Sequence, residues 1–374
     1  MLRIHFLNVG HGDCTIIEHP SGRLTMVDIN NGDELDETSH REVLAALSGR
    51  RAGGLRGQNT LATLLSGTQT TSPSLGGLLG LGDLARTNPR QGLGATLLTS
   101  GLDNPPRLGL GALALLGRSK KDELTEAGYS IELTNPVEYF VKRFPGRSIF
   151  RYIQTHPDLD HMRGLVALRE HGIRIDNFWD TEHDKIVPKF KNASDRQEWA
   201  EYQRLRGSSS SPKTLRHYQS ARGSYWNEDS SGGSDHDSIE ILSPTPDIAR
   251  SANEQDKSNN LSYVLHISYA GRTIILGGDA EADVWEQLYQ TYGHNLKCDV
   301  LKAGHHGRDS GYHANAVKAM NPTYTVVSVG KKPDTDASNK YRQYCNNVRS
   351  TRWYGDLTLE INPRGEMRWT AKYA

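Results

Sequence analysis

The chain has 374 residues, and its 44 basic side chains (Lys and Arg) balance its 44 acidic ones (Asp and Glu). A neutral chain has no global field that would attract nucleic acid or an anionic membrane, so any such preference must come from a local patch. The three cysteines, Cys14, Cys298 and Cys345, are too few and too scattered for a disulfide framework or a thiolate zinc cluster. They fit a reducing compartment.

The start of the chain does not resemble a signal peptide, because Met1 leads directly into the strand-like stretch 2–7 without a charged start and an apolar core. The longest apolar run, 108–116, is interrupted by glycines and is too short to span a bilayer. We therefore expect a soluble cytoplasmic protein that has no membrane partner.

Two segments in the first half of the chain predict regular structure. Residues 2–32 alternate like strands and are punctuated by glycine-rich turns, which favours a β-hairpin. In residues 135–155, Asn135 can cap a helix and Pro136 suits its first turn, and the β-rich stretch 148–154 follows. That predicted strand ends at a cluster of His and Asp residues.

Between these segments lies an insertion, residues 33–130, with a different composition. Its middle part, 51–118, contains no aromatic, Val, Ile, His or Cys residue and is dominated by Leu and Gly. Glycine at this density opposes order, whereas leucine at this density favours burial. Two interpretations stay open: a flexible or leucine-packed excursion, or a lid or docking element for a protein partner or a second copy of the chain.

A second irregular segment, 206–238, is rich in Ser and Gly and predicts a long surface loop. The overlapping stretch 189–222 has eight Lys or Arg residues against three acidic ones, with Trp199, Tyr202 and Tyr218 interleaved. This pattern suits a surface that follows a phosphate backbone and stacks bases. It suits equally well a solvated helix face followed by a loop.

From residue 239 onward, short β-rich runs alternate with helical patterns. The β-rich runs are 239–242, 262–269, 272–276, 300–302 and 324–329, and the helical patterns are 282–292 and 313–320. This alternation predicts a layered α/β architecture.

The hexapeptide His156-Pro157-Asp158-Leu159-Asp160-His161 places two imidazoles and two carboxylates at the end of a predicted strand. Neighbouring residues in a turn point in different directions, so His156 and Asp158 can face one metal ion while Asp160 and His161 face another. Two such ions can hold a water between two Lewis acids. A solvated charged turn is the alternative for the hexapeptide taken alone.

Two later strand ends carry side chains of the same kinds. The run 272–276 leads into Gly277-Gly278-Asp279, and the run 299–303 leads into Gly304-His305-His306-Gly307. Either motif alone would suit a cap or a surface turn. Three clusters of metal-ligand type at strand ends of one α/β chain are hard to assign to chance, and they predict a metal centre.

Together these motifs resemble the metallo-β-lactamase superfamily, and within it the ComEC-like branch, the soluble domain of DNA-uptake competence proteins. The resemblance rests on five stretches: 8–13, 155–161, 259–262, 277–281 and 301–307. It implies a four-layer αββα sandwich formed by residues 1–32 and 131–374, with the Leu/Gly-rich insertion outside it. It also implies a metal-dependent hydrolase with one or two divalent ions, Zn²⁺ or Mn²⁺, with Mg²⁺ as a further option.

The resemblance assigns roles to individual residues. The implied metal ligands are His156, Asp158, Asp160, His161, Asp279 and His305. Asp279 would bridge two ions, and Asp160 would also orient the attacking water. His306 would contact the substrate or protonate a leaving oxygen, or else would bond to nearby backbone.

Residues around the implied ligands receive supporting roles. Asp28 would brace the metal loop by hydrogen bonding, and His11 and Asp13 would lie near the centre. For Asp13, a turn residue bonded to local amides is the favoured alternative. Asn260 and Ser262 would bind substrate.

Two departures from the superfamily pattern weaken one side of the centre. Asp158 stands where the commonest superfamily motif has His, and Asn259, Asn260 and Ser262 stand where many members have a further His. His183, His217 and His236 fall in the same interval, but none follows a convincing strand. The side that contains His156 and Asp158 is therefore expected to be the weaker one, and its carboxylate favours Mn²⁺ or Mg²⁺.

The leading functional hypothesis is a phosphodiesterase or nuclease that cleaves DNA or RNA by attack of a metal-activated hydroxide on phosphorus. Nucleic acid is thus the expected substrate. One alternative is hydrolysis of a small molecule, such as a lactone, thioester or cyclic nucleotide, at the same centre. The other is a catalytically weak binding module that uses the insertion as its contact surface.

Overall fold

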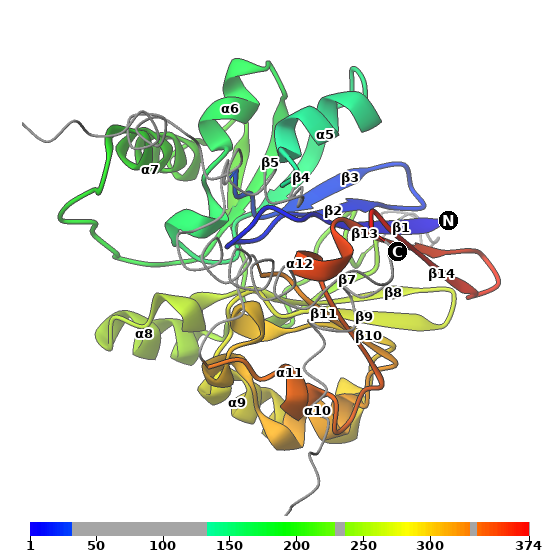
Figure 1. Cartoon of the computed structure of the whole chain (residues 1–374). Helices are drawn as coiled ribbons and strands as arrows, with labels where there is room; N and C mark the ends of the chain where they lie inside the picture. Colours follow the sequence, from blue (N-terminus) through cyan, green and yellow to red (C-terminus); the bar gives the residue numbers. More distant parts are fainter. Residues whose placement is uncertain (32–132, 229–235, 330–334, 374) are drawn as a thin grey trace, which may run out of the picture.

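The computed structural model describes residues 1–31, 133–228, 236–329 and 335–373 (Figure 1). The predicted insertion 33–130, with its Leu/Gly-rich stretch 51–118, lies outside the described residues.

The first of two sheets has eight strands in the order β14-β13-β1-β2-β3-β4-β5-β6. Their bounds are β1 Leu2–Phe6, β2 Thr15–Glu18, β3 Leu24–Val27, β4 Ile149–Ile153, β5 Ile175–Asp180, β6 Lys213–Arg216, β13 Leu357–Ile361 and β14 Met367–Ala371. Strands β14 to β3 pair antiparallel, whereas β3 to β6 pair parallel. Because β3 and β4 run in the same direction, Asp28 and the hexapeptide follow them at the same edge of the sheet.

The second sheet has six strands in the order β12-β11-β10-β9-β8-β7. Their bounds are β7 Ile239–Ser243, β8 Val264–Tyr269, β9 Arg272–Leu276, β10 Val300–Lys302, β11 Tyr324–Val327 and β12 Asn347–Ser350. Strands β9 to β12 are parallel. The turns after β9 and β10, which carry Asp279 and the two histidines, therefore lie next to each other.

Helices cover the outer face of each sheet (Figure 1). The longer ones are α5 Pro136–Arg143, α6 Leu165–Glu170, α7 Ala193–Arg206, α8 Pro246–Glu254, α9 Ala282–Tyr292 and α10 Ala314–Met320, and the short ones are α11 Ser338–Tyr341 and α12 Thr351–Tyr354. Single 3-10 turns are η1 Leu159–His161, η2 Ser258–Leu261, η3 Gly293–Leu296, η4 Gly304–Gly307 and η5 Asp309–Gly311. As the sequence predicts, α5 is capped by Asn135, whose side-chain oxygen accepts from the Val137 and Glu138 amides.

Three apolar cores hold these layers together. The central core lies between the sheets and includes Phe6, Trp179 and Ile274. One outer core joins the first sheet to α5, α6 and α7, and the other joins the second sheet to α9 and α10. The predicted four-layer αββα sandwich is thus confirmed.

The segment 206–238 contains more structure than the predicted surface loop. Residues Lys213–Arg216 form β6, which pairs in parallel with β5 at the edge of the first sheet. Trp226 is buried, with its ring centroid 4.9 Å from that of Trp179 in the central core. The polar composition of the segment does not predict these features, because they depend on one aromatic side chain and four strand residues within it.

The structure also shows the state of the cysteines and the lengths of the helices. All three cysteines are buried and unpaired, with no disulfide among them. Among the described residues, no helix has the length and apolar character needed to cross a membrane.

Candidate metal centre

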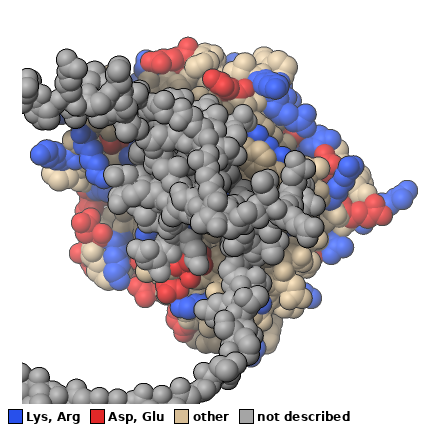
Figure 2. Space-filling view, viewed as in Figure 1, with Lys and Arg blue, Asp and Glu red and all other residues tan. Residues whose placement is uncertain are grey.

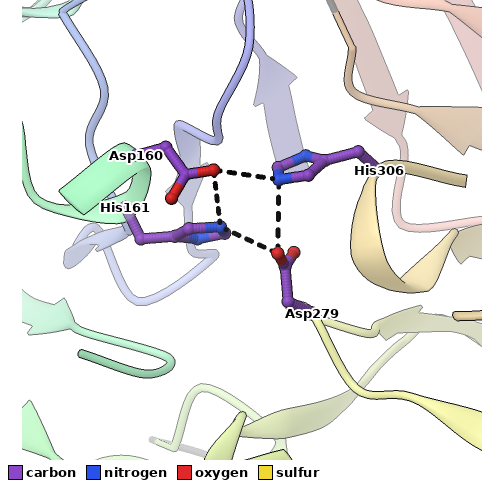
Figure 3. A group of neighbouring side chains, drawn as sticks. All are labelled: Asp160, His161, Asp279 and His306. Atoms are coloured by element: carbon purple, nitrogen blue, oxygen red, sulfur yellow. Dashed lines mark ion pairs between the residues drawn. The ribbon is translucent and has the colours of Figure 1, made fainter. Parts of the chain in front are cut away.

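Four side chains converge at the edge of the sandwich where strands of both sheets end (Figure 3). Asp160 and His161 follow β4 in the first sheet, Asp279 follows β9 and His306 follows β10 in the second. Nε2 of His161 and Nε2 of His306 each lie 3.3 Å from Oδ2 of Asp279, and Nε2 of His306 lies 3.4 Å from Oδ2 of Asp160. We call these four residues the quartet.

The far nitrogen of each quartet imidazole is fixed by a hydrogen bond. Nδ1 of His161 lies 2.8 Å from Oδ2 of Asp28, and Nδ1 of His306 lies 3.0 Å from the Ser328 carbonyl oxygen. Because both partners are acceptors, Nδ1 carries a proton in each ring, and Nε2 is the nitrogen that faces the quartet. Metal-binding histidines are typically held in this way.

Three buried polar atoms of the quartet lack a geometrically satisfied hydrogen bond. Nε2 of His161, Nε2 of His306 and Oδ1 of Asp279 are all buried and unsatisfied. Unsatisfied buried polar atoms are rare and call for a ligand or a functional reason. Two imidazole nitrogens and two carboxylates are a donor set that suits Zn²⁺ or Mn²⁺, so the quartet fits a divalent cation.

The backbone around the quartet adopts conformations that side-chain-bearing residues rarely take. Asp28, His305 and His306 have positive φ angles of 56°, 44° and 53°. Such strain costs about 1–3 kcal/mol per residue and is concentrated at functional sites. Gly278, at φ 51°, has no Cβ, and one built there would lie 3.0 Å from Ser262 and 3.2 Å from Thr155. The Asp279 turn therefore requires glycine.

The electrostatics of the quartet favour positive charge. Burial lowers the pKa of His306, but the carboxylates of Asp279 and Asp160 outweigh burial and raise it to about 10. Burial likewise opposes the charged form of His161, yet Asp279 and Asp28 raise its pKa well above the usual value. Burial raises the pKa of Asp279, and the two imidazoles reverse this and hold it well below its usual range. A bound cation would replace the protons that balance these carboxylates.

Asp28 has the position expected of a bracing residue. Its Oδ1 accepts from the Thr155 amide at 2.8 Å, and its Oδ2 accepts from the Thr155 hydroxyl at 2.7 Å and from His161. Asp28 is 1% exposed and thus connects the end of β3 to the strand end that carries the hexapeptide.

Asp13 does not make the local amide bonds that its favoured interpretation predicted. Its Oδ2 accepts from Nζ of Lys302, and both side chains are buried. Its Oδ1 lies 3.8 Å from Nδ1 of His306. Burial raises the pKa of Asp13, and the Lys302 ammonium group overcomes this and lowers it. Asp13 and Lys302 form a buried ion pair directly behind the quartet.

His11 lies at the mouth of the centre. Its side chain is 39% exposed, and its Nε2 is 3.8 Å from Oδ2 of Asp160. Nη2 of Arg308 is 3.5 Å from the same nitrogen. Burial and the neighbouring His306 lower the pKa of His11 to about 4.

The structure reverses the predicted placement of the two adjacent histidines. His306, predicted to contact substrate, is 1% exposed and belongs to the quartet. His305, predicted to be a ligand, has Nδ1 bonded to the Ser310 hydroxyl at 2.7 Å and Nε2 4.0 Å from Oδ2 of Asp279. Both residues have a left-handed backbone, which turns the second imidazole inward.

His156 and Asp158 lie beside the quartet without joining it. Nε2 of His156 is buried, unsatisfied and 3.9 Å from both Oδ2 of Asp158 and Oδ2 of Asp279. Oδ1 of Asp158 accepts from Nζ of Lys185 at 2.5 Å and from the Ser258 hydroxyl at 2.7 Å. We call His156 and Asp158 the side pair.

The predicted substrate-binding residues have structural contacts instead. The Ser262 hydroxyl, which is fully buried, accepts from the Asp279 amide at 3.0 Å. Oδ1 of Asn260 accepts from the Glu281 amide at 3.3 Å. Both residues thus hold the turn that carries Asp279, and their contact with substrate stays a prediction.

The three intervening histidines lie outside the quartet. His183 contacts Tyr202, with Nε2 2.6 Å from its hydroxyl oxygen, and His217 packs against Trp179 and Trp226. Nδ1 of His236 accepts from the Ser238 amide.

Three residues with roles at the centre received none from the sequence. Thr155 and Lys302 fall within the motifs, but nothing in their spacing shows that they contact Asp28 and Asp13. Lys185 lies in an irregular segment after β5. Its only signal is topological, because β4 and β5 are parallel and their following residues share one edge.

The basic stretch 189–222 is engaged in part with the protein itself. Arg204, Arg206, Arg216 and Arg222 form ion pairs with acidic side chains. Tyr202 is buried and donates to Asp180 at 2.6 Å. This aromatic ring is therefore not available for stacking on a base.

The αββα sandwich, with histidine and aspartate side chains at facing strand ends, has the arrangement of the metallo-β-lactamase fold. Two curated proteins are similar in sequence to part of the chain. ComE operon protein 3 of Bacillus subtilis (strain 168) is 34% identical over 92 residues, which is 24% of this chain and 11% of that protein. Competence protein ComA of Neisseria gonorrhoeae is 32% identical over 112 residues, which is 29% of this chain and 16% of that protein. The resemblance to ComEC-like proteins is thus confirmed, although it spans less than a fifth of each relative.

Two further comparisons add little. No family model matches the chain. Among solved structures, a mutant of CmlA beta-hydroxylase is 11% identical with a TM-score of 0.38, covering 96% of this chain and 54% of that one. A likeness this distant carries no argument about function.

Proposed function

We propose that this chain is a metal-dependent phosphodiesterase that cleaves DNA or RNA. The observation that carries the proposal is the quartet, in which two imidazole nitrogens and two carboxylate oxygens lie within 4.8 Å of one another at strand ends of both sheets. The similarity to two competence proteins supports nucleic acid as the substrate class.

The quartet residues have distinct tasks in this proposal. A divalent cation held by the quartet supplies Lewis acidity, which activates water and stabilises negative charge on phosphoryl oxygens. Asp160 has 24% of its side chain exposed, so its carboxylate can orient an attacking water and accept its proton. Asp279 and His306 are buried and would hold the cation.

Residues at the mouth suit an anionic substrate. Arg308 lies beside His11, which itself lies 3.8 Å from Asp160, and Lys185 contacts Asp158. Guanidinium and ammonium groups on two sides can hold a phosphodiester in place. On the face shown in Figure 2, basic and acidic side chains are interspersed over the visible described surface.

The test is cleavage of single- and double-stranded DNA and RNA by chelator-treated protein after addition of Mn²⁺, Zn²⁺ or Mg²⁺. Cleavage should require the metal and should fall about a thousandfold in Asp160→Asn, because water orientation and cation binding are lost together. The matched control is Glu170→Gln at the exposed end of α6, which should cleave like the wild type. Cleavage that persists in Asp160→Asn, or that needs no metal, would contradict the proposal.

A second candidate is hydrolysis of a small molecule, for which a cleft of about 210 Å³ lies between α8 and α9, outside the quartet. The cleft is lined by Lys257, Asn260 and Gln287 among others, and Asn259 next to it contacts Glu281 beside His305. Salt distinguishes the candidates: binding of a nucleic acid weakens steeply as salt rises, whereas binding of a small neutral substrate does not.

A further inference from the structure

Lys185 contacts the carboxylate that the sequence assigns to a second metal ion. Its Nζ is 2.5 Å from Oδ1 of Asp158 and 3.0 Å from the Ser258 hydroxyl, which itself donates to Oδ1 of Asp158 at 2.7 Å. The Lys185 and Asp158 side chains are 24% and 28% exposed, so the contact lies at the border of the centre and not in open solvent. Asp158 thus already has a cationic partner.

The position of Lys185 is fixed by a chain of buried groups behind it. The Lys185 amide donates to Nδ1 of His183 at 3.1 Å, and Nε2 of His183 is 2.6 Å from the Tyr202 hydroxyl oxygen. That hydroxyl donates to Asp180 at 2.6 Å, and Arg206 pairs with Asp180 at 3.2 Å. These contacts tie the irregular segment after β5 to α7, so the backbone of Lys185 is held where its side chain reaches Asp158 and Ser258.

The side pair also lacks the ligands that the quartet has. Among the described residues, two groups of three or more His, Cys, Asp or Glu side chains have ligand atoms all within 4.8 Å of one another, and neither includes His156 or Asp158. One is the quartet, and the other is Asp13, Asp28 and His161. Where a further ligand would be needed, Asn260 and Ser262 are engaged with the turn of Asp279.

We propose that the chain binds one divalent cation, at the quartet, and that the Lys185 ammonium group takes the place of a second cation beside Asp158. The charge that a second ion would supply to the side pair comes from the protein itself. The inference rests on the metal centre of the proposed function, but it does not depend on the substrate.

The experiment measures the ratio of bound metal to protein, by mass spectrometry and by calorimetric titration with Mn²⁺ and Zn²⁺. The wild type should bind one ion. His156→Gln should still bind one, because the side pair holds none, whereas His306→Gln should lose the ion. A wild type that binds two ions, one of which is lost in His156→Gln, would overturn the proposal.

Variants of Lys185 test whether its charge excludes the second ion. In Lys185→Gln the affinity for a second ion should rise at least about tenfold over the wild type, because a like charge a few ångströms away is removed. Adding His156→Gln to this variant should abolish the second ion, and Lys185→Arg, which keeps the charge, should bind one. Lys189→Gln, at an exposed position four residues on, is the control and should also bind one.

Two outcomes separate this inference from the metal centre itself. If Lys185→Gln still binds a single ion at millimolar metal, Lys185 is not what excludes a second ion, and the inference is wrong while the centre stands. If the wild type binds no ion, the metal centre is wrong and the inference fails with it. Thermal unfolding of each variant shows whether it is folded, so loss of binding is not confused with loss of structure.

Discussion

The quartet and the side pair draw on the same six-residue motif, yet they differ in almost every physical respect. In the quartet, the imidazoles are anchored by Asp28 and by the Ser328 carbonyl, and their free nitrogens meet two carboxylates. In the side pair, His156 presents a free nitrogen, but Asp158 is bonded to Lys185 and Ser258.

This difference shows that a run of ligand-type residues does not determine how many ions a centre holds. The number depends on which ligand atoms remain without partners after folding. Here the deciding neighbours, Lys185 and Ser258, come from segments outside the hexapeptide, 27 and 100 residues away from Asp158. Substitutions on either side can break or sharpen the contrast.

The largest effect is expected at Asp279, whose Oδ2 lies 3.3 Å from both quartet imidazoles and 3.9 Å from His156. Asp279→Asn should abolish metal binding and lower cleavage about a thousandfold or more, because it removes the central charge of the site. Metal content and cleavage rates measure both. Asp283→Asn, on the exposed side of α9, is the matched control. Full metal content in Asp279→Asn would show that the quartet is not the binding site.

Part of the architecture that brings the quartet and the side pair together is predictable from the sequence, and part is not. Strands β4, β9 and β10 are short apolar runs that end in glycine or in the hexapeptide, so their positions and the convergence of their ends are predictable. The start of helix α5 is predictable from its capping residue Asn135 and from Pro136 in its first turn. Local patterns of this kind predict the strands and helices that form the four layers, without reference to long-range contacts.

The inward imidazole of the pair His305 and His306 is not predictable from spacing. It depends on the φ angles of both residues and on a carbonyl acceptor at Ser328, more than 20 residues further along the chain. Lys185 is invisible for a similar reason, because its role depends on the packing of the segment after β5. Motifs show which ligands are available, whereas tertiary contacts decide which of them are used.

The two adjacent histidines give the next largest effect. His306→Gln should lower metal affinity about a hundredfold or more, because a ligand of the quartet is lost. His305→Gln should change affinity less than about threefold, since His305 is bonded to Ser310 and lies at the border. Calorimetric titration measures both variants side by side. Equal losses in the two would contradict the assignment of His306 to the quartet.

Residues that hydrogen-bond to the imidazoles should also differ between the quartet and the side pair, with smaller effects on metal affinity. Asp28→Asn should weaken metal binding about 10- to 100-fold, because Asp28 orients His161 and favours the tautomer that binds metal. Thr155 contacts Asp28 as well as the side pair, so Thr155→Val would disturb both the quartet and the side pair. Ser262→Ala is therefore the variant to compare with Asp28→Asn. The Ser262 hydroxyl lies 3.4 Å from Nδ1 of His156. The substitution should alter affinity only a few-fold, through the Asp279 amide that this hydroxyl also accepts from. A larger loss in Ser262→Ala than in Asp28→Asn would place the ion nearer the side pair.

The last contrast is in the stability of the metal-free protein, which depends on pH in opposite directions on the two sides. Asp279 and Asp160 outweigh burial and raise the pKa of His306 to about 10, above its unfolded value of about 6.5. The stabilisation from its protonated form is present below pH 6.5 and is lost as pH rises toward 10. Burial and the neighbouring His161 lower the pKa of His156, so its contribution is lost as pH falls below 6.5.

Urea unfolding in a chelator between pH 5 and pH 9 measures both trends. His306→Gln should flatten the alkaline side of the stability profile, and His156→Gln should flatten the acidic side, each by up to about 1.4 kcal/mol per pH unit. Metal should bind more tightly as pH rises, because the quartet must release its protons to accept the cation. An alkaline profile of His306→Gln parallel to that of the wild type would mean that His306 is not charged in the metal-free protein. The quartet would then lack the affinity for positive charge that distinguishes it from the side pair.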